Sequence, residues 1–270
     1  MASRFSRLSK LGALTTRVSS SYLGQAVTGF FQDEGSRKES LDRLHLENAE
    51  RIVRDLGSLK GAAMKVGQAV AQLSDNLDLP PDVRLVLGRL HDKAEPVPFE
   101  QVKKRVEEEL GGSIDSLFKR FDPAPLGTAS LGQAHAATLP DGSDVVVKVL
   151  HTGIDGSVHA DLAALKTLLV AGRFLRRPKE EIDAIFDEIE ERLTEELDYR
   201  QEALHLQEFR RYFAENPDIS IPAVHAGWST GRVLTMERLH GRPLPVFTAS
   251  APEPIKQKAG LALARAHLRM

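Results

Sequence analysis

The pattern of hydrophobic and polar positions predicts a helical first part of the chain. Apolar residues recur every three or four positions across 41–73, which is the spacing of one buried helix face. The prolines at 80–81 end this pattern, because proline cannot continue a helix. Residues 82–92 resemble a short helix. A further helix is expected to begin near Pro98 and to stop at Gly111-Gly112.

The pattern changes after Pro123, where strands are expected. Residues 132–150 read as a strand, a Pro-Asp-Gly-Ser turn at 140–143 and a β-branched run, which together predict a hairpin. A long helical region follows, and its stretch 180–198 carries ten acidic residues and one basic residue. A second hairpin is expected to turn at 229–231. After a linker, a helix is predicted over roughly 252–270.

Composition narrows the classes of protein. The 270 residues carry a formal net charge of −2, so the chain lacks the strongly basic balance that is typical of nucleic-acid binding. There are no cysteines, which excludes disulfides and thiolate chemistry. The nine histidines show no metal-ligand spacing, so no metal site is predicted. No apolar run approaches the ~18 residues typical of a membrane span, and we expect a cytoplasmic protein, peripheral to a membrane at most.

The first 32 residues differ from the rest because they are basic and contain no acidic residue. An acid-poor segment that is rich in arginine and serine resembles an organellar transit peptide. The same composition is compatible with a basic helix on an anionic lipid surface, or simply with a solvated helix whose end is frayed. These three interpretations stay open.

Candidate chemistry first appears in the predicted hairpin. Gly127 and Gly132 have the spacing of a phosphate-covering glycine loop, although the middle glycine is replaced by alanine and a simple hairpin turn explains the same residues. Lys148 lies inside an apolar strand, where an unpaired ammonium group would be costly to bury. It therefore needs a carboxylate or phosphate partner, unless it is on an edge strand and reaches water.

Two acidic positions stand out from the solvated acidic stretch. Glu196 continues the apolar stripe of Ile185, Ile189 and Leu193, so it is expected to face inward. Asp198 and Glu202 are spaced i, i+4 and are expected to share a neighbouring helix face. A glycine-type loop, a strand lysine and a helix glutamate in this order are typical of the small lobe of a protein kinase.

A polar stripe also needs an explanation. Lys65, Gln68 and Gln72 line one face of an otherwise apolar helix that is rich in small residues. A lysine in such surroundings requires a carboxylate partner.

With these motifs the chain resembles the UbiB/AarF family of atypical kinases, which is linked to ubiquinone and isoprenoid-lipid metabolism. The family's K-x-G-Q motif matches Lys65, Gly67 and Gln68. Its alanine-rich loop matches Gly127, Thr128, Ala129 and Ser130, although the family usually has three alanines before the serine. Its strand lysine matches Lys148, and its E-x-D motif matches Glu196 and Asp198. Its lysine-pairing glutamate matches Glu202, and its hinge matches the segment around Glu237.

The resemblance implies an α+β fold: a kinase-like small lobe with an antiparallel sheet plus helix, an amino-terminal helical extension, and a large lobe that is mostly absent. It implies that Lys148, Glu202, Glu237 and the loop 127–130 bind ATP or ADP, with Mg²⁺ only in a complete family member. It also implies that Lys65 and Gln68 form a lid that points at Glu196 and Asp198. Four segments are expected: a basic segment 1–40, the helical extension 41–97, the small lobe 98–240, and the hinge with a first large-lobe helix at 241–270.

One group of residues is missing for phosphoryl transfer. A kinase needs an Asp and an Asn in its catalytic loop and the Asp of D-F-G, all after the hinge. After His240 this sequence has neither Asp nor Asn, and its one acidic residue is Glu253. We therefore expect a truncated relative that is inactive by itself. Three hypotheses stay open: a kinase or ATPase whose activity belongs to a complete parent, a non-catalytic module that binds nucleotide or a partner, and a helical membrane-surface or scaffold protein that uses residues 1–75. A nucleotide is the expected partner, and a membrane surface or an isoprenoid lipid is a further candidate.

Overall fold

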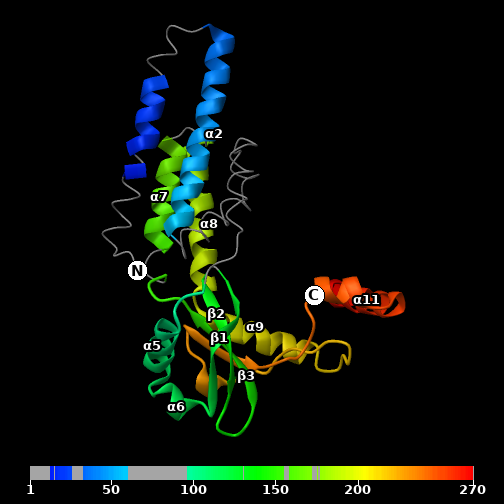
Figure 1. Ribbon diagram of the computed structural model, residues 1–270. Helices are drawn as coiled ribbons and strands as arrows, with labels where there is room; N and C mark the ends of the chain where they lie inside the picture. The colour runs from blue at the N-terminus through cyan, green and yellow to red at the C-terminus, as the bar shows by residue number, and fades with distance from the viewer. Residues whose placement is uncertain are drawn as a thin grey trace.

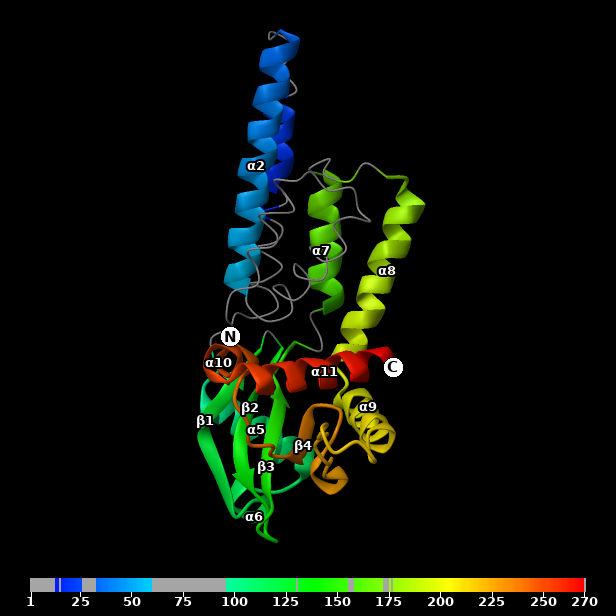
Figure 2. The same ribbon diagram turned by 90° about the vertical axis from the view of Figure 1, so that its right-hand side faces the viewer.

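The computed structural model describes residues 13–14, 16–25, 33–59, 96–129, 131–154, 158–171, 175 and 177–269. A four-stranded antiparallel sheet has helices on both faces, and a group of long helices extends from one end of the sheet (Figures 1 and 2). The α+β class is therefore confirmed. The predicted short helix at 82–92, like the helical pattern beyond residue 59, lies outside the described residues.

The sheet contains the predicted hairpin. Its strands are β1 (Arg120–Thr128), β2 (Gly132–Thr138), β3 (Asp144–Leu150) and β4 (Val233–Glu237), in the order β1-β2-β3-β4. The β2–β3 turn contains Gly142 at φ 92°, a left-handed conformation that glycine adopts without steric cost. Lys148 on β3 lies opposite Ala134 on β2 and Leu234 on β4, so its strand has a neighbour on both sides.

The second predicted hairpin is only partly formed. The segment before the turn makes one isolated bridge, Val224 to Met236, and then a 3₁₀ helix, η3 (Ala226–Trp228), instead of a strand. The Thr235 hydroxyl donates to the Trp228 carbonyl at 2.6 Å and the Ser229 hydroxyl accepts from the Thr235 N–H at 3.0 Å. Side-chain hydrogen bonds thus replace part of the backbone ladder, which hydrophobic periodicity alone does not reveal.

One face of the sheet is covered by α5 (Phe99–Leu110) and α6 (Ile114–Leu117). The predicted end of α5 is confirmed, since Gly111 forms its C-cap at φ 74°. The strand β3 turns Val145, Val147 and Val149 toward this face, where they are buried. Because side chains alternate along a strand, Lys148 projects from the opposite face.

The opposite face carries α9 (Tyr199–Tyr212), which follows α8 (Lys179–Glu196) after a short break. The break is closed by backbone hydrogen bonds, because the Tyr199 N–H donates to the Gly231 carbonyl at 2.9 Å beside β4. The first turn of α9 is therefore fixed against the sheet.

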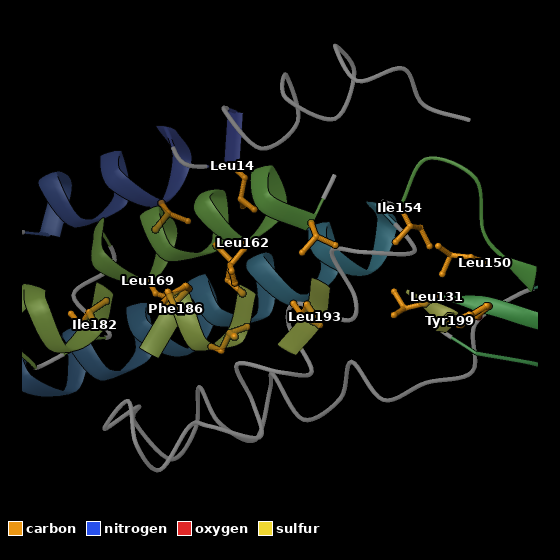
Figure 3. Packing of buried hydrophobic residues seen from close by; sticks show 14 of the residues in the cluster. Leu14, Leu131, Leu150, Ile154, Leu162, Leu169, Ile182, Phe186, Leu193 and Tyr199 are labelled. Carbon is orange, nitrogen blue, oxygen red and sulfur yellow. The ribbon is translucent and has the colours of Figure 1, made fainter. Parts of the chain in front are cut away.

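The long helices are α2 (Glu34–Leu59), α7 (Val158–Ala171) and α8, together with helical residues 16–25. Figure 3 shows a buried hydrophobic cluster in which Leu14 lies near α7 and α8 residues such as Leu162 and Phe186. The same cluster continues through Leu193 to Leu131, Leu150 and Tyr199 at the sheet. Although α7 and α8 fall inside the predicted small-lobe range 98–240, they pack against each other and share their buried cluster with Leu14 and Val18 from the amino-terminal part.

The carboxy-terminal part forms α10 (Leu244–Ser250) and α11 (Glu253–Arg269). The helix expected at 252–270 is confirmed, whereas α10 occupies a stretch where a linker was predicted. An ion pair of 3.2 Å joins Lys258 on α11 to Asp218 in the segment after α9. None of the helices in the described part of the chain combines the length and apolar character needed to cross a membrane.

Candidate functional site

A cleft of about 650 Å³ opens between the β1–β2 turn, β3, the end of α8 and the start of α9. Its walls contain one lysine, four acidic side chains and a buried tyrosine, and the lining residues are Ala129, Leu131, Gly132, Lys148, Arg192, Glu195, Glu196, Asp198, Tyr199, Gln201, Glu202 and His205. Its volume lies within the roughly 300–1,000 Å³ that is typical of small-molecule sites.

The ion pair predicted between Lys148 and Glu202 is confirmed. The Lys148 Nζ donates to Glu202 Oε2 at 2.6 Å and to Oε1 at 2.9 Å. The two side chains are 30% and 38% exposed, so water reaches the pair from the cleft. The lysine therefore has the carboxylate partner that its place in an apolar strand requires.

Tyr199 also contacts this lysine, and sequence reasoning missed it. The Lys148 Nζ lies 4.7 Å from the centroid of the Tyr199 ring, within the range of a cation–π contact. The tyrosine is only 3% exposed. Burial, followed by the negative charge of Glu202, raises the pKa of its hydroxyl. The sequence signal was an aromatic residue that directly follows the E-x-D match.

The glycine-type loop is a tight hairpin connection. Gly127 and Thr128 belong to β1, and the Ala129 N–H donates to the Gly132 carbonyl at 2.8 Å. Ala129 lines the cleft, whereas Ser130 lies outside the described residues. A Cβ atom at Gly127 would meet nothing within 4 Å, but one at Gly132 would lie 2.6 Å from Tyr199 Oη and 2.6 Å from the Val149 carbonyl oxygen. Close packing thus requires the second glycine.

The acidic residues of the E-x-D match are arranged differently from the prediction. Helix α8 ends at Glu196, and Asp198 is the N-cap of α9, where its Oδ1 accepts from the Arg200 N–H at 3.0 Å. Asp198 and Glu202 therefore do not share one continuous helix face, because the chain breaks between the two helices. Glu196 is exposed, and the stripe that turns inward is instead Ile182, Phe186, Ile189 and Leu193. Glu196 and Asp198 nevertheless both line the cleft.

The predicted lid cannot be compared with this geometry, because Lys65, Gly67 and Gln68 lie outside the described residues. Their contact with Glu196 and Asp198 stays a prediction.

Glu237 is not brought to the cleft. Its Oε2 lies 3.4 Å from Arg210 Nη1 and accepts from the Ala223 N–H at 3.1 Å. Glu237 and Arg210 line a second cavity of about 320 Å³, which shares no lining residue with the cleft. Only Glu237's place at the end of β4 agrees with the hinge that the resemblance predicts.

The cleft can bind an anionic group at Lys148, but its described residues are poorly arranged to bind a metal ion. An ammonium group has three N–H donors, and two hydrogen bonds from Lys148 go to Glu202. Arg192, at the rim, is engaged by Glu188 at 2.6 Å. Within the ranges that the structure describes, no three acidic or histidine side chains are placed to hold a metal ion together.

Comparisons with known proteins agree with these features. The sequence model of the family described as "ABC1 atypical kinase-like domain" matches residues 89–262. The chain is 32% identical over 251 residues to "Atypical kinase COQ8, mitochondrial" of Saccharomyces cerevisiae, covering 93% of this chain and 50% of that protein. It is 34% identical over 253 residues to "Atypical kinase COQ8B, mitochondrial" of Rattus norvegicus, covering 90% and 46%.

A bacterial relative and a solved structure extend the comparison. "Probable protein kinase UbiB" of Pseudomonas paraeruginosa is 34% identical over 208 residues, which cover 75% of this chain and 38% of that protein. A structure described as the complex of Rv3197 with erythromycin, from Mycobacterium tuberculosis, is 30% identical with a TM-score of 0.50, covering 80% of this chain and 54% of that chain. The chain spans half or less of the length of these three curated relatives.

Proposed function

Because the chain belongs to the ABC1 atypical kinase-like family, we propose that its cleft binds the phosphates of an adenine nucleotide, ATP or ADP. The observation that carries this proposal is the Lys148 ammonium, which faces the cleft between the Glu202 carboxylate and the Tyr199 ring. A lysine held in this way is a point charge that can donate to a phosphate oxygen. The loop around Gly127, Thr128, Ala129 and Ser130 would then cover the phosphates from above.

The charge distribution supports a role for Lys148 in particular. The cleft contains four acidic side chains, so its general electrostatic balance does not attract an anion. The third N–H of Lys148 is the donor that has room for one, because the carboxylate of Glu202 occupies the other two. Glu202 thus orients the lysine, while the ligand must supply the remaining acceptor.

Residues 1–270 are proposed to bind nucleotide without turning it over. Transfer of a phosphoryl group requires metal ions that carboxylate and amide side chains hold in place. Residues 241–270 contain no Asp and no Asn, so they offer no counterpart for the ligands that kinases place after the hinge. When bound in a complete site, Mg²⁺ would neutralise the developing phosphate charge. The role proposed for residues 1–270 is therefore nucleotide binding and not phosphoryl transfer.

The cellular context is proposed from the family alone. The fungal and rat relatives are named as mitochondrial proteins, and the resemblance links the family to ubiquinone and isoprenoid lipids. We extend both to this chain as a proposal: nucleotide binding that serves quinone or isoprenoid-lipid metabolism, at or near a membrane surface. The basic composition of the first 32 residues is compatible with targeting to an organelle or to an anionic surface.

Nucleotide binding can be tested by calorimetry on the full chain with ADP and with ATP. Lys148→Gln should weaken both affinities by about tenfold or more, because a charge-assisted hydrogen bond is lost. The chain offers a matched control in Lys166, which pairs with Asp183 at 2.6 Å and lies 5.4 Å from the Phe186 ring, away from the cleft. Lys166→Gln should leave the affinities unchanged.

Two results would contradict the proposal. Equal affinities in the wild type and Lys148→Gln would show that the cleft lysine does not meet the phosphates. ATP hydrolysis by residues 1–270 that Lys148→Gln abolishes would show that the cleft supplies its own metal ligands, and the proposed absence of turnover would then be wrong.

A further inference from the structure

The contacts around Lys148 leave one residue without a role in the proposed function. Only 3% of the surface of Tyr199 is exposed, and this residue still lines the cleft. Its ring lies under the same ammonium group that Glu202, three residues further along α9, also holds. Lysine has four rotatable side-chain bonds, and a single carboxylate fixes the distance to its ammonium group better than the direction of the third N–H.

Three contacts fix the position of the tyrosine. Its N–H donates to the Gly231 carbonyl at 2.9 Å. Asp198, directly before it, caps α9 through the Arg200 N–H. The Tyr199 hydroxyl lies only 2.6 Å from where a Cβ atom on Gly132 would be. The ring therefore fits beside the β1–β2 turn only because residue 132 has no side chain. Tyr199, the first residue of α9, therefore packs against both Gly132 beside the β1–β2 turn and the strand lysine.

We propose that Tyr199 is the positioning residue that sets the direction of the Lys148 ammonium group and couples it to the β1–β2 turn. The negative face of the ring attracts the cation, and the rigid backbone contacts keep the ring in place. Glu202 and Tyr199 then hold the ammonium group on two sides and leave the third N–H directed into the cleft. This inference rests on the proposed nucleotide site, and it predicts that the aromatic ring matters for phosphate binding more than the hydroxyl group.

A second lysine, on α7, has a similar pair of neighbours. Lys166 is also held by a carboxylate, Asp183, and an aromatic ring, Phe186. There the ring belongs to Phe186, which is buried in the hydrophobic cluster of α7 and α8. At the cleft the ring belongs to a tyrosine that packs beside Gly132 and lines the cleft.

The contact can be measured without any nucleotide by NMR on the full chain with isotope-labelled lysine. Protons next to the ammonium group that lie over an aromatic ring are shifted upfield. We expect such a shift for Lys148, identified by its loss in Lys148→Gln, and expect it to persist in Tyr199→Phe and to vanish in Tyr199→Leu. A wild-type Lys148 resonance at an ordinary lysine position would overturn the inference even if nucleotide binds.

The functional consequence is measured by the affinities for ADP and for adenosine. Tyr199→Phe should bind ADP within about twofold of the wild type, whereas Tyr199→Leu should lose about tenfold, the scale of a partly desolvated cation–π contact. The loss should be confined to ADP, because adenosine has no phosphate for Lys148 to meet. A general packing defect would instead weaken the binding of both ligands.

A second series keeps the test valid if Tyr199→Leu does not fold. Phenylalanine analogues with increasing fluorine substitution, placed at position 199, preserve the ring shape while weakening its negative face. The ADP affinity should fall stepwise along the series, and an unchanged affinity would overturn the inference. If Lys148→Gln does not weaken ADP binding, the proposed nucleotide site fails. If it does, but the ring variants bind normally, only the role of Tyr199 fails.

Discussion

Acidification should destabilise the fold through His151, which directly follows β3. Its imidazole is 8% exposed, and among the described residues its Nε2 has no hydrogen-bond partner. The backbone N–H of His151 donates to the Leu131 carbonyl in the β1–β2 turn at 2.8 Å. Arg105 on α5 lies close enough for its Nη2 to contact the His151 carbonyl oxygen at 3.5 Å. A proton on this imidazole would therefore be buried and, among the described residues, without a hydrogen-bond partner at Nε2.

The magnitude follows from the shifted pKa. Burial lowers the pKa of His151 from 6.5 to about 4. A base with a lowered pKa in the folded state contributes its full stability above the unfolded value, and that stability is lost as the pH falls toward the folded value. Each pH unit between the two values costs about 1.4 kcal/mol. At about pH 5, roughly 1.5 units below the unfolded pKa, the loss is about 2 kcal/mol.

The assay is urea unfolding of the wild type and of His151→Gln at about pH 7.5 and about pH 5. The free energy of unfolding of the wild type should fall by about 2 kcal/mol more than that of the variant, which has no imidazole to protonate at this position. His267→Gln is the matched control, because His267 is exposed on α11, and it should retain the wild-type pH dependence. Identical pH dependence in the wild type and His151→Gln would refute the reasoning.

Two further predictions concern the elements that frame the cleft. Gly132→Ala should lower the free energy of unfolding by about 1–3 kcal/mol, because its Cβ would overlap a backbone carbonyl and the Tyr199 hydroxyl, both at 2.6 Å. In the same thermal or urea unfolding, Gly127→Ala should change this free energy little, because its Cβ would meet nothing within 4 Å. Asp198→Ala should cost about 1 kcal/mol through the lost N-cap of α9, while Asp198→Asn should keep most of that stability; equal losses in both variants would show that the charge, and not the cap, stabilises the fold.

Local sequence signals determined much of the fold. The turn at 140–143 and the alternating valines of β3 specified the β2–β3 hairpin, and the glycine at 111 specified the end of α5. These features depend on residues that are neighbours along the chain, so periodicity and turn chemistry reveal them. The same local reasoning identified Lys148 as a residue that needs an anionic partner. The family membership followed from several such motifs in one order.

The arrangement around the cleft was decided by tertiary packing. The sequence suggested one helix through Glu196, Asp198 and Glu202, but the contact of Tyr199 with Gly231 ends α8 and begins α9 between them. That contact joins segments that are far apart in the chain, and no periodicity records it.

The sequence by itself determined which side chains carry charge and which strand holds Lys148, since both are properties of the local pattern. The family resemblance predicted Glu202 as the partner of that lysine, and only the tertiary structure decided the rest of its surroundings. Glu202 lies 54 positions further along the chain, the Tyr199 ring reaches the ammonium group because Gly132 makes room for its hydroxyl, and Glu237 faces Arg210 in a different cavity. A buried charge requires a partner, but which residue provides it depends on how distant elements pack.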